Sequence, residues 1–375
     1  MRKLILIFIS LIFLISPVLA EEPDIKATGA VLMEKESGRI LWQKNANKAM
    51  APASTTKIMT AVIVLENSSL DRVVSVDKEA CTAPKVKMGL KAGERITVEQ
   101  LLYALMLQSS NDAAVALAID TAGSVEGFAA LMNEKARNIG CRDTYFVTPN
   151  GIDKGEHHST PHDMALIAAY ALNNAEFCRI IGTKRVDFKT DKNSYSIYNH
   201  DRFLSEYPGA LGIKTGFTGK AGHCFAGAAR RNGLTLVSVV FASGWGSEGK
   251  ELKWRDTRAL MDYGFDSCRY EQILNKGAFV REVKVINGEE KALRLIIAED
   301  MGTALKNDEK YNIYCDIPTA VYAPVKAGQT VGNAKITING ECIANIPIIA
   351  EADIKKLGFW DNLLKLVRLW PNSLI

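Results

Sequence analysis

Apolar and polar residues alternate along residues 29–45, GAVLMEKESGRILWQKN, on both sides of Glu36-Ser37-Gly38. A period of two about turn-forming residues predicts a β-hairpin. Two apolar runs within residues 212–243 are joined by Asn232-Gly233, the strongest short hairpin signal, and predict two more strands. Hairpins near both ends of one domain can pair into a single antiparallel sheet, so we expect such a sheet with helices packed against it.

The segments between these hairpins carry the three-to-four-residue apolar spacing of helices. Thr97 with Gln100 is a capping box, Gly140 is a helix stop signal, and Thr160 before Pro161 is a helix start signal. A break at Ser109-Ser110-Asn111 divides one apolar stretch into two helices. The expected helices cover 55–66, two runs within 96–120, 125–140, 160–172, and 249–263 with a stop at Gly264.

Beyond residue 269 the pattern changes to short strands separated by turn pairs, at Asn287-Gly288, Ala327-Gly328 and Asn339-Gly340. We therefore predict a first domain at 21–268 and a small all-β domain at 269–351. Residues 352–375 then show an amphipathic helical pattern, with basic side chains on one face and two tryptophans on the other. Such a helix fits a membrane surface. A terminal helix docked on its own protein is the alternative.

The first 20 residues form a separate segment. Arg2 and Lys3 precede an apolar run at 4–15, and Val18-Leu19-Ala20 is a small-residue cleavage sequence. This pattern is typical of a secretory signal peptide, so we predict export and a mature chain that begins at Glu21. An uncleaved membrane anchor is the alternative, because the apolar run approaches the length of a helix.

Composition narrows the class of partner. The chain of 375 residues has room for about two domains. Its 46 basic and 42 acidic residues give a net charge of +4, which is too balanced to suggest a nucleic-acid partner. Seven scattered cysteines without a C-x-x-C pair indicate reduced, mostly buried thiols rather than a disulfide framework.

Candidate chemistry begins with Ser54 and Lys57 at the head of the first apolar helix. A serine hydroxyl becomes a nucleophile when a base takes its proton, and residues three apart on a helix share one face. Lysine is a base only when burial or a second cation keeps it neutral. An ordinary helix N-cap is the alternative role for Ser54. Two further pairs of this spacing lie in polar or glycine-rich stretches, Ser75 with Lys78 and Ser247 with Lys250.

Two more short motifs follow along the chain. Ser109-Ser110-Asn111 lies in the break between two helices, where side chains are free to face a cleft. Lys214-Thr215-Gly216 stands between glycines at the start of a predicted strand, where an extended substrate can lie close to the strand edge. Each tripeptide is weak alone. The order S-x-x-K, S-x-N, K-T-G, with each motif on the element it needs, is a strong signal.

Together these motifs resemble a known family. PASTTKIMTA, LMLQSSNDAA, TPNGID and GIKTGFTGKAGHC are similar to the low-molecular-mass penicillin-binding proteins, the D-alanyl-D-alanine carboxypeptidases, over about residues 27–265. The resemblance implies an α/β (α+β) fold, in which a five-stranded antiparallel sheet has helices on both faces and the active site at its edge. It also implies a membrane-anchored enzyme at the outer face of the cytoplasmic membrane, without a cofactor.

The resemblance implies catalytic roles for three residues and a binding role for a fourth. Ser54 attacks the penultimate D-alanine of a peptidoglycan stem peptide, and β-lactams acylate the same hydroxyl. Lys57 takes its proton, and Ser109 relays a proton to the leaving D-alanine. Asn111 holds the substrate amide and helps to orient Lys57. Many relatives carry glycine or aspartate where this chain has Ser110, so we expect altered substrate fit without loss of activity.

The remaining implied roles concern substrate binding. Lys214 and Thr215 bind the terminal carboxylate, and Lys214 supplies the cation that keeps Lys57 neutral. Gly216 leaves space for the peptide. The backbone N–H groups of Ser54 and Phe217 form the oxyanion hole.

A metal site, or another class of enzyme or binding protein, would require different residues. The cluster of His157, His158, His162 and Asp163 has spacings that zinc sites use, but Thr160-Pro161 starts a helix within it, so we expect a polar helix start and no metal. A β-lactamase needs a way to hydrolyse its acyl-enzyme, typically a Glu-x-x-Leu-Asn loop, which the chain lacks between its second and third motifs. A D,D-endopeptidase would use the same residues as a carboxypeptidase. An inactive cell-wall-binding module would use none of them.

Overall fold

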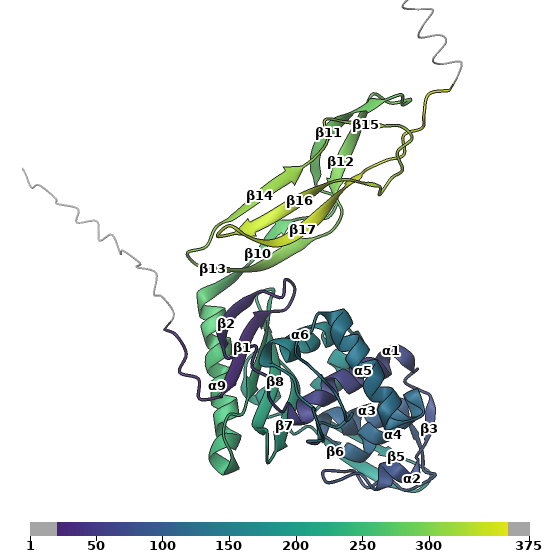
Figure 1. The fold of residues 1–375 in the computed structure, drawn as a ribbon, viewed down its shortest axis with the longest axis vertical. Coiled ribbons are helices and arrows are strands. Elements are labelled where there is room, and N and C mark those ends of the chain that lie inside the picture. Colours follow the sequence, from purple (N-terminus) through teal and green to yellow (C-terminus); the bar gives the residue numbers. More distant parts are fainter. Residues whose placement is uncertain (1–20, 359–375) are drawn as a thin grey trace, which may run out of the picture.

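The structure is a computed structural model that describes residues 21–358, so the predicted signal peptide at 1–20 and residues 359–375 lie outside the described residues. The first domain is built on a five-stranded antiparallel sheet in the order β2-β1-β9-β8-β7, which confirms the predicted sheet (Figure 1). Its strands are β1 (Gly29–Glu34), β2 (Ile40–Lys44), β7 (Ala210–Thr218), β8 (Gly222–Arg231) and β9 (Leu234–Phe241).

Helices cover both faces of this sheet, as predicted. Alternate side chains of β1 enter two different cores: Val31 and Met33 pack with the helices from the middle of the chain, whereas Ala30 and Leu32 pack under α9 (Gly246–Ser267). Figure 1 shows α9 running along one side of the sheet, with the helices α1 to α6 gathered on the opposite side. The strand period of two therefore sets the two layers of the domain.

The last helix runs further than its sequence predicts. The prediction that Gly264 ends the helix is wrong, because α9 continues to Ser267. A Cβ atom on Gly264 would lie 2.6 Å from Leu236 Cδ1 and 2.8 Å from Leu32 Cδ2. Glycine is thus needed here for close packing of the helix on the sheet, and not as a stop signal.

The middle of the domain follows its capping signals. Thr97 and Gln100 form the predicted capping box, Gly140 caps α5, and Thr160 caps α6. The predicted break at residues 109–111 separates α3 from α4. The helices are η1 (Ala53–Thr56), α1 (Lys57–Asn67), α2 (Lys78–Cys81), α3 (Val98–Leu107), α4 (Asn111–Ala122), α5 (Val125–Ile139), α6 (Pro161–Ala171), α7 (Ala175–Gly182) and α8 (Phe203–Glu206).

Three features of this region differ from the sequence prediction. The helix predicted at 55–66 is preceded by the short 3₁₀ helix η1, so regular α-helix begins only at Lys57. The segment predicted as two strands contains three, because a turn after Thr218 separates β7 from β8. Lys214 consequently lies in the middle of β7 and not at its start. Two ribbons are also present, β3 (Val73–Ser75) with β4 (Arg95–Thr97) and β5 (Arg185–Lys189) with β6 (Ser194–Tyr198).

The second domain is all-β, as predicted. Six strands form a sheet in the order β14-β16-β17-β12-β11-β15, and β10 pairs with β13. Asn339 and Gly340, both with positive φ, make the predicted turn between β16 and β17. The strands are β10 (Cys268–Leu274), β11 (Phe279–Ile286), β12 (Ala292–Ile297), β13 (Met301–Lys306), β14 (Tyr311–Asp316), β15 (Ala320–Tyr322), β16 (Thr330–Ile338) and β17 (Glu341–Ala350).

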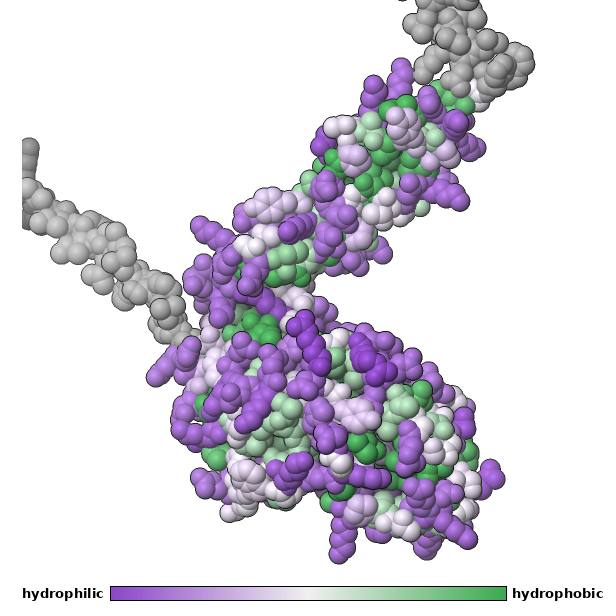
Figure 2. All heavy atoms as spheres, in the orientation of Figure 1, coloured by the Kyte–Doolittle hydropathy of each residue, from purple (hydrophilic) through white to green (hydrophobic). Residues whose placement is uncertain are grey.

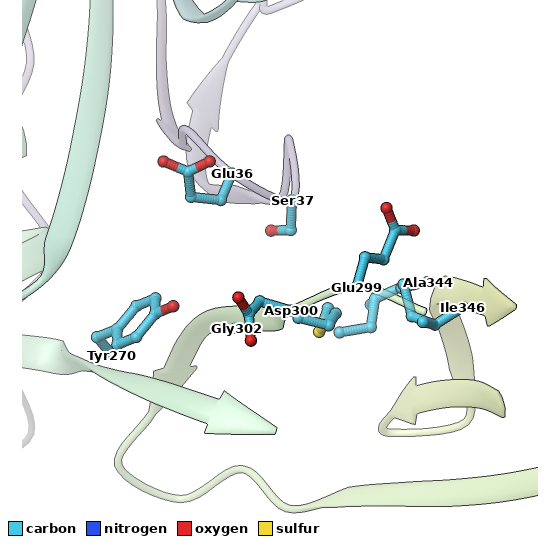
Figure 3. A pocket seen from close by; sticks show the side chains of 10 residues that line it. Glu36, Ser37, Tyr270, Glu299, Asp300, Gly302, Ala344 and Ile346 are labelled. Carbon is cyan, nitrogen blue, oxygen red and sulfur yellow. The ribbon is translucent and has the colours of Figure 1, made fainter. Parts of the chain in front are cut away.

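The two domains are joined by more than the chain. Arg39, in the β1–β2 turn, donates to the Ala304 carbonyl at 2.8 Å and forms an ion pair with Glu309. Cys268 and Ala304 pack in the hydrophobic core under α9. A cavity of about 410 Å³ lies at this junction, between the β1–β2 turn and the second domain. Figure 3 shows the side chains that line it.

The end of the described chain corrects the predicted start of the terminal helix. Residues 352–358 are not helical: Ile354 and Lys356 form β-bridges with Val325 and Gly288, so any terminal helix begins later.

All seven cysteines are unpaired, but only Cys224 and Cys268 are buried, so the prediction of mostly buried thiols is wrong.

Figure 2 shows mainly hydrophilic residues over the visible face of both domains, with smaller hydrophobic areas between them. In the part of the chain that the structure describes, no single helix is long and apolar enough to cross a membrane. The helices α4 and α5 reach that length and apolarity together, with a bend of 84° between them.

Candidate active site

Ser54 and Lys57 meet at the junction of η1 and α1. Lys57 Nζ lies 3.0 Å from Ser54 Oγ; the lysine is fully buried and the serine half-buried. Pro52 is the N-cap of η1 and Thr56 that of α1, and neither helix start receives a side-chain capping bond. Ser54 therefore does not act as a helix cap, and its hydroxyl is free to face Lys57.

The Lys57 amine has two further partners, and both are acceptors. Nζ lies 2.7 Å from Asn111 Oδ1 and 2.6 Å from the Asn150 carbonyl oxygen. The orientation of the Asn111 amide is fixed because its Nδ2 donates to the carbonyls of Pro84 and Lys85, at 3.1 and 3.0 Å. Neither partner can donate a hydrogen bond, so both contacts must use N–H groups of the lysine.

Burial holds the pKa of Lys57 well below its usual value, and the positive charge of Lys214 lowers it further, while Asp112 opposes the shift. A neutral amine has two N–H bonds and one lone pair. Asn111 and Asn150 accept both N–H bonds, so the lone pair remains for the hydroxyl of Ser54. This is the arrangement that a general base requires.

The third motif lies beside the nucleophile on the edge strand β7. A Cβ on Gly216 would lie 3.0 Å from the backbone nitrogen of Ser54 and 3.2 Å from that of Thr55. The glycine therefore lets β7 approach η1 closely. This contact brings Lys214 and Ser54 into one site, and the role of Gly216 in leaving space for the peptide stays a prediction.

The electrostatics around Lys214 involve two residues that no motif contains. Lys214 is buried, and burial lowers its pKa to about 7; Asp201 raises the value and Lys253 lowers it. Asp201 accepts from the backbone N–H groups of Phe203 and Ile213, and burial raises its pKa to about 6. Lys253 in α9 is also buried, with its pKa lowered to about 8. The site thus contains three lysines that lose their protons unusually easily.

The other predicted residues are less tightly engaged. Ser109 is half-buried between α3 and α4 with φ of +65°, and its hydroxyl makes no hydrogen bond to any residue in the range 21–358. The structure thus does not connect it directly to Ser54 or Lys57. Thr215 is half-buried. Phe217 is half exposed, and its ring lies 4.4 Å from the His223 ring, centroid to centroid.

A loop at 147–152 completes the site, and the sequence motifs do not identify what holds it. His157 Nδ1 accepts from the N–H groups of Val147 and Thr148, at 3.0 and 3.3 Å. Its Nε2 must then carry the proton and donates to Thr56 Oγ1 at 2.9 Å. Burial lowers the pKa of this histidine to about 4. The ring is a neutral brace between the loop and the Ser54 turn.

The same loop passes very close to η1. Gly151 has φ of +80°, and a Cβ there would lie 1.9 Å from the Ala53 carbonyl oxygen. Thr60 Oγ1 donates to the Pro149 carbonyl at 2.6 Å. The Pro-Asn-Gly sequence is the signal that could have identified this loop, since its glycine tolerates both the positive φ and the close approach.

The histidines of the suspected metal cluster go to separate partners. His157 contacts Thr56, His158 lies 3.2 Å from Asp143, and His162 lies 3.4 Å from Asp163. Across residues 21–358, no three histidine, cysteine or acidic side chains are arranged to hold a metal ion.

Two families match this chain in succession. The sequence model described as "D-alanyl-D-alanine carboxypeptidase" matches residues 17–244, and that of the "Penicillin-binding protein 5, C-terminal domain" matches residues 269–356.

Individual relatives agree over most of the chain. D-alanyl-D-alanine carboxypeptidase DacF of Bacillus subtilis (strain 168) is 32% identical over 357 residues, which cover 92% of this chain and 90% of the relative. DacC of Escherichia coli (strain K12) is 30% identical over 373 residues, covering 94% and 91%. The crystal structure of penicillin-binding protein 5 from Haemophilus influenzae superposes with a TM-score of 0.75 at 27% identity, covering 89% of this chain and 99% of that one. With its motifs assembled in one site, the chain belongs to the D-alanyl-D-alanine carboxypeptidase family of low-molecular-mass penicillin-binding proteins.

Proposed function

We propose that the protein is a serine-type carboxypeptidase that removes the terminal D-alanine from peptidoglycan stem peptides through an acyl-enzyme on Ser54. The observation that carries the proposal is the set of contacts at Lys57. Its two acceptors, Asn111 Oδ1 and the Asn150 carbonyl, leave the amine lone pair for the Ser54 hydroxyl at 3.0 Å.

In the first step, Ser54 Oγ forms a bond to the carbonyl carbon of the penultimate D-alanine and its proton passes to Lys57. The developing oxyanion lies between the backbone N–H groups of Ser54 and Phe217, each worth about 3 kcal/mol by comparison with serine hydrolases. The close approach of β7 to η1 at Gly216 supports this pairing of donors.

The intermediate then collapses with cleavage of the peptide C–N bond. The leaving nitrogen needs one proton, which Lys57 holds and Ser109 relays. Ser109 lies two residues before Asn111, the first residue of α4, and its hydroxyl makes no hydrogen bond within the described residues, so it is available for this transfer. Lys57 next accepts a proton from water, and the hydroxide attacks the ester carbonyl. The ester C–O bond then breaks, Lys57 returns the proton to Ser54 Oγ, and the shortened peptide leaves as the acid.

The terminal carboxylate of the substrate is bound by Lys214 and Thr215. A bound anion also favours the protonated form of Lys214, whose pKa is otherwise lowered to about 7. Lys253 adds positive charge on the same side. β-Lactams carry a carboxylate and a strained amide, so the same groups bind them and Ser54 is acylated.

We further propose the division of the chain inferred from its sequence. Residues 1–20 direct export, 21–268 form the peptidase domain, and 269–351 form the β domain, which the bridges at Ile354 and Lys356 extend to 358. The rest of the predicted amphipathic segment, residues 359–375, attaches the protein to the outer face of the membrane. Its basic and tryptophan-bearing faces in the sequence support this attachment.

The test is incubation with a fluorescent penicillin, followed by intact mass and peptide mapping. One slowly lost adduct on Ser54, together with D-alanine release from a pentapeptide, is expected. Ser54→Ala should abolish both, whereas the matched variant Ser247→Ala should change neither. A folded protein that takes up no penicillin and releases no D-alanine would overturn the proposal. Cleavage of cross-linked peptides without D-alanine release would instead indicate an endopeptidase.

A further inference from the structure

A second polar pocket lies at the end of strand β7. It has a volume of about 390 Å³ and is lined by residues 49–51, residues 155–158, Asp143 and Lys220. We call it the β7-end pocket. None of the three sequence motifs contributes a residue to it.

Three contacts tie this pocket to the nucleophile. His157, in its wall, donates to Thr56, which is two residues from Ser54. Met50 pairs with Ser159 through two backbone hydrogen bonds of 2.8 and 3.0 Å, which join two of the walls. Lys220 follows the last residue of β7 by two positions, and β7 touches the Ser54 turn at Gly216. The pocket is therefore the next space along β7 beyond the oxyanion hole.

The direction of the substrate follows from the proposed function, on which this inference rests. With the terminal carboxylate at Lys214 and the scissile carbonyl at the Phe217 N–H group, the rest of the stem peptide continues along β7 toward Lys220. Three strand residues span about 10 Å, which an extended peptide residue and a long side chain also cover. The third residue of the stem peptide consequently reaches the β7-end pocket.

The charges in the pocket are of both signs. Lys220 projects from the β7–β8 turn and Glu156 from the 155–158 segment, and both residues are exposed. Within residues 21–358 neither side chain takes part in an ion pair or hydrogen bond, whereas Asp143 is occupied by His158. The pocket thus presents an unpaired cation and an unpaired carboxylate from two different walls.

We propose that the β7-end pocket selects the third stem-peptide residue and favours a side chain that ends in an ammonium and a carboxylate on one carbon, as in diaminopimelate. Lys220 binds the carboxylate and Glu156 the ammonium. A lysine at the third position has the ammonium alone, so it leaves Lys220 without a partner. Lys220 is a specificity residue and takes no part in the bond-breaking steps.

The experiment compares D-alanine release from two pentapeptides that differ only in the third residue, diaminopimelate or lysine. The wild-type protein should have the higher kcat/KM with diaminopimelate. Lys220→Gln should reduce the ratio of the two kcat/KM values by about fivefold, the effect of losing one partly exposed ion pair. Glu156→Gln should lower both values and leave the ratio nearly unchanged, because both peptides carry the ammonium.

Lys250→Gln is the matched control. Lys250 is an exposed lysine in α9 that lies close enough to His223 to influence its pKa but does not line the pocket. It should leave the ratio unchanged. A wild-type ratio near one, or an equal loss of ratio in Lys220→Gln and Lys250→Gln, overturns the inference. Release of D-alanine from neither peptide by the wild-type protein would overturn the proposed function instead. Unchanged penicillin acylation of Lys220→Gln establishes that the variant is folded.

Discussion

Two of the three S-x-x-K sequences in this chain, Ser54 with Lys57 and Ser247 with Lys250, lie near the start of a long helix and differ in their surroundings. At α1, Lys57 is fully buried and has three polar partners, including Ser54. At the start of α9, Ser247 and Lys250 are both exposed, and their side chains form no hydrogen bond with each other. The spacing is therefore only a condition for reach. Burial, and acceptors that occupy the amine's own protons, make one lysine a base and leave the other a solvated charge.

Removing the base from the buried region should have the largest effect. Lys57→Ala should lower the rate of Ser54 acylation by roughly 10³- to 10⁴-fold, the upper part of the range for a general base. The rate of fluorescent penicillin uptake measures this. Lys250→Ala should react like the wild-type protein, and a comparable loss in that variant would end the distinction between the two regions.

Disturbing the approach of β7 should come second. Gly216→Ala places a Cβ atom 3.0 Å from the Ser54 nitrogen, so β7 and η1 must separate. We expect acylation to slow by roughly 10- to 100-fold, the effect of a small misplacement of reacting groups. Gly219→Ala, three residues further on, meets no atom within 4 Å and should have no effect. Equal rates for the two variants would mean that the contact with Ser54 is unimportant.

The pH dependence should reflect the lysines of the buried region. Lys57 must be neutral, so kcat/KM should rise with pH on the acidic side. Lys214 must be protonated to bind the carboxylate, and since its pKa is lowered to about 7, kcat/KM should fall as the pH rises above that value. Lys214→Arg keeps its charge at high pH, so its profile should lack this fall. A fall of kcat/KM at the same pH in Lys214→Arg would show that a group other than Lys214 is responsible.

The smallest predicted effect concerns the brace beneath the buried region. His157→Gln should destabilise the protein by about 2 kcal/mol at pH 7, because backbone donors of the 147–152 loop lose a well-placed acceptor. The sign of its pH dependence is fixed: the histidine is neutral when folded, with a pKa of about 4, and titrates near 6.5 when unfolded. Its contribution to stability, about 3 kcal/mol, is lost as the pH falls from 6.5 to 4.

Urea unfolding at pH 7 and pH 4 tests this, because the advantage of about 2 kcal/mol in unfolding free energy that wild type has over His157→Gln at pH 7 should disappear in acid. His158→Gln changes a more exposed neighbour and is the control. An undiminished difference at pH 4 would show that His157 is not a neutral brace.

Local chemistry was predictable where neighbours in sequence determine it. The Asn232-Gly233 turn, the Thr97 capping box and the three motifs all depend on a few adjacent residues, and all were found in the expected elements. The helix stop predicted at Gly264 was wrong for a reason that the neighbouring residues could not show. The purpose of a glycine can be to admit atoms from a distant strand or turn, and the sequence around it does not reveal them.

The electrostatic surroundings of the site were not predictable. Asp201, Lys253 and His157 each lie far in sequence from the motif residue that they influence, and burial determines their pKa values. The carbonyl of Asn150 is invisible to any motif, since every residue has one. Only the fold brings that oxygen to Lys57.

The interface between the two domains holds the β domain in one position relative to the peptidase domain. Cys268 and Ala304 share a hydrophobic core with the first domain. Arg39 donates a hydrogen bond to Ala304 and forms an ion pair with Glu309, so these contacts restrict rotation of the peptidase domain relative to the β domain. These contacts fix the position of the β domain, which ends the described chain at residue 358, relative to Ser54 in the peptidase domain. The second domain thereby sets the distance from Ser54 to residue 358. A longer or shorter β domain would change which layer of the surrounding peptidoglycan is hydrolysed, while the catalytic residues stayed the same.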